Sequence, residues 1–397
     1  MNERRESTQG LLTVAAILLS SALNYGFTLL LGRWLDAAQY GAFASFTSLF
    51  MLSAALPVAF QQATSRRPAG ANTRAALRAG GLLSLLLLAL APFARPAGLE
   101  PAWVAAFALT VAPLVVLGAW RGAAQRDGRT VAFGLSLLVE HGLKIALTLP
   151  LLSVLPGAAA AVAATLLGML LALPVVRPAR PAGAGVPAGA PAEGKRLLAL
   201  GAAAQSGLLY GSVLMAGALL GPGGSGPFAA AATLARLVFF AGWAVQVAAF
   251  PLVARRAARG EPLRPLLLGA LGATLLVAGL PAALLMAAPD WCARLAFGGA
   301  LSGVSALLPV AALGTFLLTV AGTVLNHRLA SGVAGAPWFT ARAYLLACGA
   351  LLLAMPFGRQ PAPLMLLAAL GQGSLLLFAA SSFAPHSWRS FRVVSRV

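Results

Sequence analysis

Apolar runs of 18 or more residues recur from one end of this chain to the other. Each run is long enough to cross the hydrocarbon core of a bilayer, which is ~30 Å thick. Of the 397 residues, 60% are hydrophobic and only 9% are charged, whereas a soluble domain carries about 25% charged residues. One protein core cannot hide so much apolar surface, so lipid must solvate much of it. Because segments in lipid satisfy their backbone hydrogen bonds as helices, we predict an all-α polytopic membrane protein.

The apolar runs divide into twelve predicted transmembrane helices. Their approximate bounds are 9–32, 41–63, 79–98, 102–120, 131–152, 157–176, 197–220, 228–252, 265–287, 303–326, 339–357 and 362–384. The first run has no A-x-A-like cleavage site after it, so we interpret it as a retained span rather than a signal peptide. The outer loops are short, the longest being about 15 residues near 288–302. Neither face has room for a soluble catalytic domain, and no GxxxxGKS or GxxxxGKT sequence indicates ATP binding.

Basic residues indicate how these helices are oriented. If the N-terminus lies in the cytoplasm, most of the 28 lysines and arginines fall on the cytoplasmic side, in agreement with the positive-inside rule. The outer side receives only Arg33, Arg95, Arg294 and Arg359, and the predicted spans hold Lys144, Arg236 and Arg342. An even number of spans then places both termini in the cytoplasm. This distribution explains the net charge of +19 without a nucleic-acid partner.

The amino-acid composition indicates the kind of organism and the membrane in which the protein lies. Arginine far outnumbers lysine, and alanine, glycine and proline are abundant, as is typical of a GC-rich bacterial genome. We therefore predict a location in the bacterial cytoplasmic membrane. The basic C-terminal stretch 386–397 is expected to lie on the anionic cytoplasmic leaflet of that bilayer.

The two halves of the chain resemble each other. Three sequence matches are each 189 residues apart: Leu31-Gly32 with Leu220-Gly221, Arg66-Arg67 with Arg255-Arg256, and Pro92 with Pro281. We predict an N-terminal six-helix bundle at 1–176 and a C-terminal six-helix bundle at 197–385. A Pro/Gly/Ala-rich cytoplasmic linker at 177–196 would join them. Two bundles that both enter the membrane from the cytoplasm form a parallel repeat, an architecture typical of transporters.

Three stretches carry a family resemblance. Residues 23–67, LNYGFTLLLGRWLDAAQYGAFASFTSLFMLSAALPVAFQQATSRR, combine a mid-span Asn, an Asp-x-x-x-Tyr-Gly turn and an Arg pair. Residues 291–332, WCARLAFGGALSGVSALLPVAALGTFLLTVAGTVLNHRLASG, place a Phe-Gly turn before a span that ends near Asn326. Residues 229–257 end in Phe-Pro before basic residues. Together they resemble polysaccharide-biosynthesis flippases, the oligosaccharide-lipid (Wzx-like) branch of the multidrug/oligosaccharidyl-lipid/polysaccharide (MOP) exporter superfamily.

This resemblance implies a fold and a function. The fold would be a MATE-like, V-shaped pair of six-helix bundles that works by alternating access. The family moves polyprenyl-diphosphate-linked oligosaccharides, the precursors of cell-surface polysaccharides, from the inner to the outer leaflet. A proton or a sodium ion is the expected coupling ion. The second half departs from the pattern, because its outer turn GPGGSGPF lacks the Tyr-Gly of the first half.

The fifth predicted span carries the clearest candidate site. Ser136, Glu140, Lys144 and Thr148 recur every four residues and therefore form one stripe on a helix, with His141 close to the same side. Charged groups inside a span are expensive and usually mark function. In the functional interpretation, Lys144 attracts the substrate's diphosphate and Glu140 or His141 carries a coupling proton. In the structural alternative, Glu140 and Lys144 form an intrahelical pair that only neutralises two costly charges.

The eighth predicted span contributes Arg236, with Phe240 and Trp243 at i+4 and i+7. In the functional interpretation, Arg236 binds phosphate while Trp243 contacts sugar or isoprenoid. In the structural alternative, Arg236 extends toward the membrane surface or pairs with a backbone carbonyl, and the aromatic rings face lipid. Asn24, in the first span, completes the candidate cavity residues, although polar residues in spans more often bond neighbouring helices. No cluster of His, Cys, Asp and Glu indicates a metal, and no cofactor is expected.

Three alternative functions differ from the flippase in substrate or in class. A MATE-like cation, drug or metabolite antiporter would need several cavity acids, and only Glu140 qualifies. A lipid II flippase is expected to carry two further C-terminal spans. A membrane glycan polymerase would need a sizeable outer loop with catalytic residues, whereas the outer acids Asp36, Glu100 and Asp290 lie far apart in the sequence. We therefore expect a transporter of an anionic substrate and not an enzyme.

Overall fold

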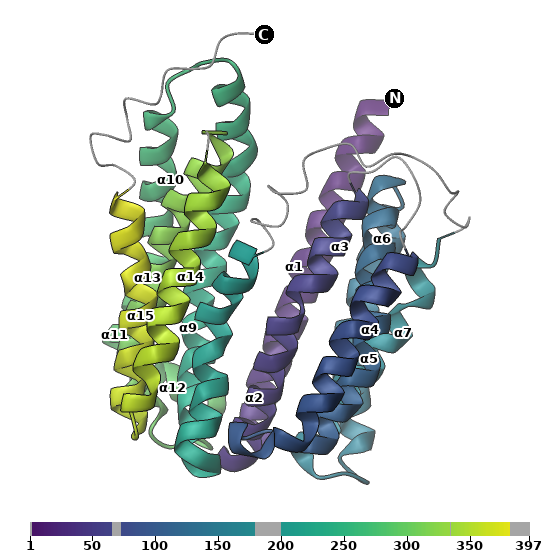
Figure 1. Cartoon of the computed structure of the whole chain (residues 1–397), viewed down its shortest axis with the longest axis vertical. Helices are drawn as coiled ribbons and strands as arrows, with labels where there is room; N and C mark the ends of the chain where they lie inside the picture. The colour runs from purple at the N-terminus through teal and green to yellow at the C-terminus, as the bar shows by residue number, and fades with distance from the viewer. Residues whose placement is uncertain (1, 66–72, 179–199, 334, 382–397) are drawn as a thin grey trace. The chain divides into compact units, whose positions relative to one another are not determined.

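The computed structural model describes residues 2–65, 73–178, 200–333 and 335–381. Every regular element in these ranges is a helical one (Figure 1), which confirms the predicted all-α class. Eleven helical segments in them are long and apolar enough to cross a membrane. A further helix, α1 (Asn2–Trp34), occupies the position of the first predicted span.

The chain divides into two compact units, Met1–Ala190 and Pro191–Val397. The predicted linker, apart from residues 177 and 178, lies outside the described residues, and so does the predicted basic tail at 386–397. Those two segments therefore stay predictions.

Unit 1 consists of seven helices and three short 3₁₀ turns in its described part. The helices after α1 are α2 (Ala37–Ser53), α3 (Ala55–Ser65), α4 (Thr73–Leu90), α5 (Pro101–Arg126), α6 (Thr130–Leu151) and α7 (Gly157–Ala172). The turns are η1 (Ala91–Phe93), η2 (Arg95–Ala97) and η3 (Pro174–Val176). Helix α1 packs mainly on α6, while α5 packs on α3 and α4.

Unit 2 begins with the span Leu200–Gly221, which contains the π-helical turn η4 (Gly207–Gly211). Its further elements are α9 (Ser212–Ala258), α10 (Arg264–Val277), α11 (Gly279–Ala287), α12 (Pro289–Phe297), α13 (Val304–Ala330), α14 (Ala336–Ala354), η5 (Met355–Phe357) and α15 (Pro361–Ser381). Helix α13 packs on both α9 and α15 and so forms the centre of this unit.

Two spans are each broken four residues before a proline. Helix α2 ends at Ser53, four residues before Pro57, and α10 ends at Val277, four residues before Pro281. Proline has no N–H, so the carbonyl four residues earlier loses its helical partner. Each pair, α2 with α3 and α10 with α11, is therefore one membrane-crossing segment with an internal break.

The long helix α9 turns a corner at Gly221. This residue has φ 67° and ψ −176°, values at which a Cβ atom would be strained, and it separates the span Leu200–Gly221 from the span Gly223–Ala258. In unit 1 the corresponding corner lies between α1 and α2. There Asp36 caps α2 by accepting a hydrogen bond from the backbone N–H of Gln39 at 2.8 Å.

Glycines allow the helices of unit 1 to approach one another closely. A Cβ on Gly122 of α5 would lie 2.2 Å from the carbonyl oxygen of Gln61 in α3, and one on Gly168 of α7 would lie 2.6 Å from the carbonyl oxygen of Glu140 in α6. Both distances are far below van der Waals contact. Gly168 therefore fixes the position of α6 at the level of its charged residues.

The loop predicted near 288–302 contains the amphipathic helix α12. Its Cys292 and Phe297 side chains are buried, whereas Trp291 and Leu295 are exposed. Burial raises the pKa of the Cys292 thiol above its ordinary value. With nine residues, α12 is too short to cross a membrane, so a search of the sequence for apolar runs of membrane-crossing length does not find it.

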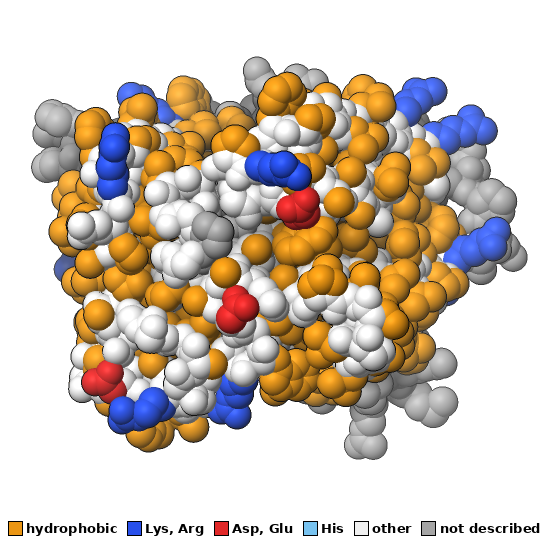
Figure 2. Space-filling model, turned by 90° about the horizontal axis from the view of Figure 1, so that it is seen from below, with side chains coloured by type: hydrophobic (Ala, Val, Ile, Leu, Met, Phe, Trp, Pro, Cys, Tyr) orange, Lys and Arg blue, Asp and Glu red, His pale blue; other side chains and the backbone are white. Residues whose placement is uncertain are grey.

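Charged residues lie at both ends of the helices. In unit 1, Arg126 and Arg129 lie at the end of α5 and start of α6, and Arg33 and Arg95 lie at the opposite end, where α1 and α4 finish. The lower ends of the helices are seen in Figure 2, where charged side chains lie scattered among hydrophobic ones. The orientation of the chain in a membrane stays a prediction.

Candidate functional site

A buried polar stripe runs along α6. Ser136, Glu140, Lys144 and Thr148 are all less than 10% exposed, and they lie on one face as their four-residue spacing predicts. Helices α1, α5 and α7 pack against α6. The stripe is therefore enclosed by protein in unit 1.

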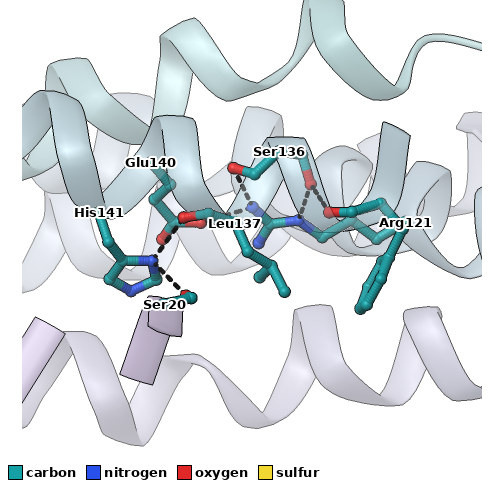
Figure 3. A network of polar contacts seen from close by, with 7 residues as sticks. Ser20, Arg121, Ser136, Leu137, Glu140 and His141 are labelled. Atoms are coloured by element: carbon teal, nitrogen blue, oxygen red, sulfur yellow. Dashed lines mark hydrogen bonds and ion pairs between the residues drawn. The ribbon is translucent and has the colours of Figure 1, made fainter. Parts of the chain in front are cut away.

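Glu140 is bound by an arginine from another helix. Nη2 of Arg121 in α5 lies 2.7 Å from Oε2 of Glu140, and both side chains are almost completely buried (Figure 3). The same guanidinium donates to Oγ and to the backbone oxygen of Ser136, each at 3.0 Å. The predicted intrahelical partner of Glu140 was Lys144, whereas the structure gives it Arg121.

Arg121 is the site residue that sequence reasoning missed. It follows the predicted span 102–120 directly, so the predicted span bounds leave it among the basic residues on the cytoplasmic side. Helix α5 in fact continues to Arg126 and ends where Gly128 adopts φ 67°. The sequence between 120 and 126 contains no proline, and this was the available signal that the helix continues.

Lys144 is bound by groups from α1. Its Nζ donates a hydrogen bond to Oδ1 of Asn24 and lies 4.8 Å from the ring centre of Phe27. The structure thus brings together two of the predicted site residues, Lys144 and Asn24. Both partners of the ammonium are neutral, so neither cancels its charge.

His141 also joins α6 to α1. Its Nδ1 lies 2.8 Å from the carbonyl oxygen of Leu137 and 3.0 Å from Oγ of Ser20 (Figure 3). A carbonyl oxygen can only accept, so the geometry places a proton on Nδ1 with Ser20 as a second acceptor. The two α1 contacts, Ser20 with His141 and Asn24 with Lys144, are one helical turn apart.

This cluster has an excess of positive charge. Arg121 and Lys144 carry two positive charges and Glu140 one negative charge, while His141 is taken as neutral. No other ion pair in the described residues involves Lys144 or Glu140. A buried charge without a counterion is unfavourable, and an anion would relieve it.

Arg236 lies in unit 2, on α9. Its Nε donates to the carbonyl oxygen of Leu209 at 3.3 Å and its Nη1 to Oγ1 of Thr233 at 3.4 Å. The guanidinium carbon lies 4.4 Å from the ring centre of Tyr210. Trp243, predicted to stand beside Arg236, lies about two turns further along α9 and is 47% exposed, so its substrate contact stays a prediction.

The π-helical turn η4 explains why Arg236 finds a backbone acceptor. In a π turn the i→i+4 bonding pattern is interrupted, which frees carbonyl groups for other donors. The carbonyl of Leu209 accepts from Arg236, and the carbonyl of Leu208 accepts from Nε2 of Gln372 in α15 at 3.0 Å. A small cavity beside these groups is lined in part by Ser212, Arg236, Thr315 and Gln372.

Other polar residues in the spans bond helices to one another. Asn326 of α13 donates to Gln246 of α9 at 2.5 Å. Gln246 donates to the carbonyl oxygen of Thr319 at 3.1 Å, and Gln205 donates to the hydroxyl of Tyr344 at 3.0 Å. These contacts are the interhelical bonds expected of amides within spans.

The described residues define a two-unit, helical membrane protein with a buried charged cluster in unit 1 and Arg236 within a span of unit 2. Solved structures with this fold include one described as the inward-facing conformation of a multidrug resistance MATE family transporter of the MOP superfamily. It is 15% identical, has a TM-score of 0.73, and the match covers 96% of this chain and 98% of that chain. The lipid II flippase MurJ, in an inward closed conformation, is 13% identical with a TM-score of 0.70, over 94% of this chain and 87% of that chain.

A third similar structure is a MOP superfamily transporter from Pyrococcus furiosus. Its binding pocket is described as having reverse polarity, which is said to suggest a different function. It is 15% identical with a TM-score of 0.61, over 96% of each chain. The sequence matches no protein-family model and no curated protein. The chain thus has the fold of MATE and MurJ transporters, and identities this low establish the fold alone.

Proposed function

We propose that this protein is a transporter that moves a polyprenyl-diphosphate-linked oligosaccharide across the bacterial cytoplasmic membrane by alternating access. The observation that carries the proposal is the excess positive charge in the buried cluster of unit 1. Arg121 neutralises Glu140, and Lys144 is left with the neutral partners Asn24 and Phe27. A diphosphate is an anion that such a lysine can bind.

The charges weigh against a MATE-like cation antiporter, which is the second candidate. Glu140 is the only acid within the eleven membrane-crossing segments found among the described residues, and its carboxylate is engaged by Arg121. A cation would have to compete with a buried guanidinium at 2.7 Å. The likeness to MATE structures supports the shared fold, and the likeness to MurJ supports a lipid-linked substrate equally well.

The mechanism begins at the basic ends of the helices, which gather the anionic head group while its lipid tail stays in the bilayer. Lys144 then exchanges the amide oxygen of Asn24 for a phosphate oxygen, and Arg236 can do the same with its weak contacts to Leu209 and Thr233. Release of Asn24 frees α1 from α6 at this level. A proton or a sodium ion would drive the return step.

Reconstituted proteoliposomes test the proposal directly. Flipping of a fluorescent polyprenyl-diphosphate oligosaccharide is compared with uptake of a cationic dye, for the wild type, Lys144→Ala, Arg236→Ala and the control Gly142→Ala. Gly142 lies on the same helix as Lys144, and a Cβ there meets nothing within 4 Å. We expect movement of the glycan lipid by the wild type and the control, and its loss in both charge variants.

Two other outcomes would contradict the proposal. Dye uptake without glycan-lipid movement would assign the protein to cation export and make Glu140 the residue to study. Normal glycan-lipid flipping by Lys144→Ala would remove this lysine from the mechanism. Membrane insertion and thermal stability of each variant are measured beside the assay, so that loss of transport is not confused with loss of fold.

A further inference from the structure

Two arginines of unit 2 each stack on an aromatic ring at the start of α14. The guanidinium carbon of Arg328, near the end of α13, lies 4.2 Å from the ring centre of Phe339. That of Arg342 lies 5.8 Å from the ring centre of Trp338. Trp338 and Phe339 are consecutive residues near the start of α14, so both stacked cations lie at this end of the helix, and the four residues are called the α14 cluster.

This cluster has no acidic partner in the described residues. Neither α13 nor α14 contains an Asp or a Glu, and the ion pairs among the described residues of unit 2 join Glu261 to Arg256 and to Arg259. Stacking on a ring holds a guanidinium in place but does not neutralise it. The cluster therefore keeps a net charge of two positive units.

Arg328 has an unused donor. Its Nε atom is buried and finds no hydrogen-bond acceptor among the described residues. The Nε edge of a guanidinium, together with the adjoining Nη, matches two oxygens of a phosphate. A buried N–H without an acceptor is unfavourable, so an oxygen anion at this edge would satisfy it.

The position of the cluster indicates which phosphate it meets. Arg328 lies in the last turn of the 27-residue helix α13, and Trp338 lies in the first turn of the next span. These are the ends of two membrane-crossing segments, at the level where lipid head groups lie. Trp338 is 55% exposed, as is typical of tryptophan at the membrane–water interface.

We propose that Arg328 and Arg342, held by Phe339 and Trp338, form a binding site for the phosphate group of an anionic phospholipid. The lipid's glycerol and acyl region would lie against the exposed face of Trp338. The site is at the same end of unit 2 as Arg255 and Arg256, the predicted cytoplasmic side, where anionic lipids are attracted by basic residues. The inference does not depend on which molecule the protein transports.

The test uses the full-length protein purified in an uncharged detergent. Native mass spectrometry measures binding of phosphatidylglycerol, with phosphatidylcholine as the zwitterionic comparison and inorganic phosphate as a separate arm. The variants are Arg328→Gln/Arg342→Gln and the control Arg359→Gln, which removes an exposed arginine beyond the other end of α14. We expect about tenfold weaker phosphatidylglycerol binding in the double variant and no change in the control.

The arms separate the possible sources of phosphate. Binding of phosphatidylglycerol but not of inorganic phosphate supports a lipid site, whereas equal dependence of both on the two arginines assigns a site for free phosphate instead. Equal weakening by Arg359→Gln would mean unspecific surface charge and would overturn the proposal. If the double variant does not fold, Phe339→Leu keeps both charges and removes the ring under Arg328, and unchanged binding in it would overturn the role of the stacked geometry.

Discussion

The carboxylate of Glu140 and the guanidinium of Arg121 lie 2.7 Å apart, although the two residues come from different helices, α6 and α5. The exposed fractions of the two side chains are 12% and 10%. An ion pair this deeply buried holds the two helices in one register, because removal of either partner strands the other charge.

Arg121→Gln is expected to lower the free energy of unfolding by about 3–5 kcal/mol, the usual result of leaving one buried charge unpaired. Adding Glu140→Gln to this variant should restore most of the loss, since neither charge of the Arg121–Glu140 pair is then left without its partner. Thermal unfolding in detergent measures both. Arg126→Gln is the control, because Arg126 pairs with the more exposed Asp127 and such pairs contribute roughly 0–1 kcal/mol. Equal effects of Arg121→Gln and Arg126→Gln would show that burial of the pair does not matter.

Asn24→Leu should weaken the attachment of α1 to α6. The ammonium of Lys144 loses its amide oxygen and is left buried without that acceptor, at a cost of about 1–3 kcal/mol. Limited proteolysis of α1 and thermal unfolding report the change. Thr28→Val is the matched control on the same helix, since the Thr28 hydroxyl donates to the carbonyl oxygen of Asn24 within α1. No loss of stability in Asn24→Leu would argue that water replaces the amide.

Gly122→Ala is expected to destabilise unit 1 by roughly 1–3 kcal/mol, because its new methyl group would collide with the backbone of Gln61 at 2.2 Å. Gly142→Ala, in an open position on α6, should instead be neutral or stabilise by up to about 1 kcal/mol through helix propensity. The midpoints of thermal unfolding of the two variants are compared. If both midpoints shift in the same direction, close packing of α3 on α5 does not explain the effect of Gly122→Ala.

Gly221→Ala isolates the effect of backbone conformation. No atom lies within 4 Å of the added methyl group, so the expected loss of about 1–3 kcal/mol comes from φ 67° alone. Gly223→Ala, two residues later and equally open, lacks a left-handed φ and should not lower stability. Unfolding of the two purified variants under one condition measures the difference, and identical midpoints would contradict the corner at Gly221.

Hydropathy predicts the eleven helical segments that are long and apolar enough to cross a membrane, and the twelfth predicted span, 9–32, lies within helix α1. The predicted span 157–176 coincides with the observed Gly157–Val176, and 265–287 differs from Arg264–Ala287 by one residue. The end of α5 was placed six residues too early, because Arg121 and Arg126 were assumed to be in water. A charged residue with a buried partner can continue a helix, and no single-sequence pattern reports that partner.

Only part of the candidate site could be predicted in the same way. The four-residue spacing placed Glu140 and Lys144 on one face of α6, which the structure agrees with. Their partners Arg121 and Asn24 are 19 and 120 residues away in the sequence, so periodicity cannot identify them. The contact of Gln372 with Leu208 depends on a π turn, which hydropathy does not reveal.

The π turn at Gly207–Gly211 has a consequence for how the two halves of the chain are aligned. A π turn holds about one residue more than an α turn, so it is equivalent to a one-residue insertion in an otherwise regular helix. The offset of 189 that relates Leu31-Gly32 to Leu220-Gly221 then applies only after the turn, and residues before Gly207 correspond to α1 with an offset of 188. Any comparison of equivalent positions in the two halves should open a gap inside η4.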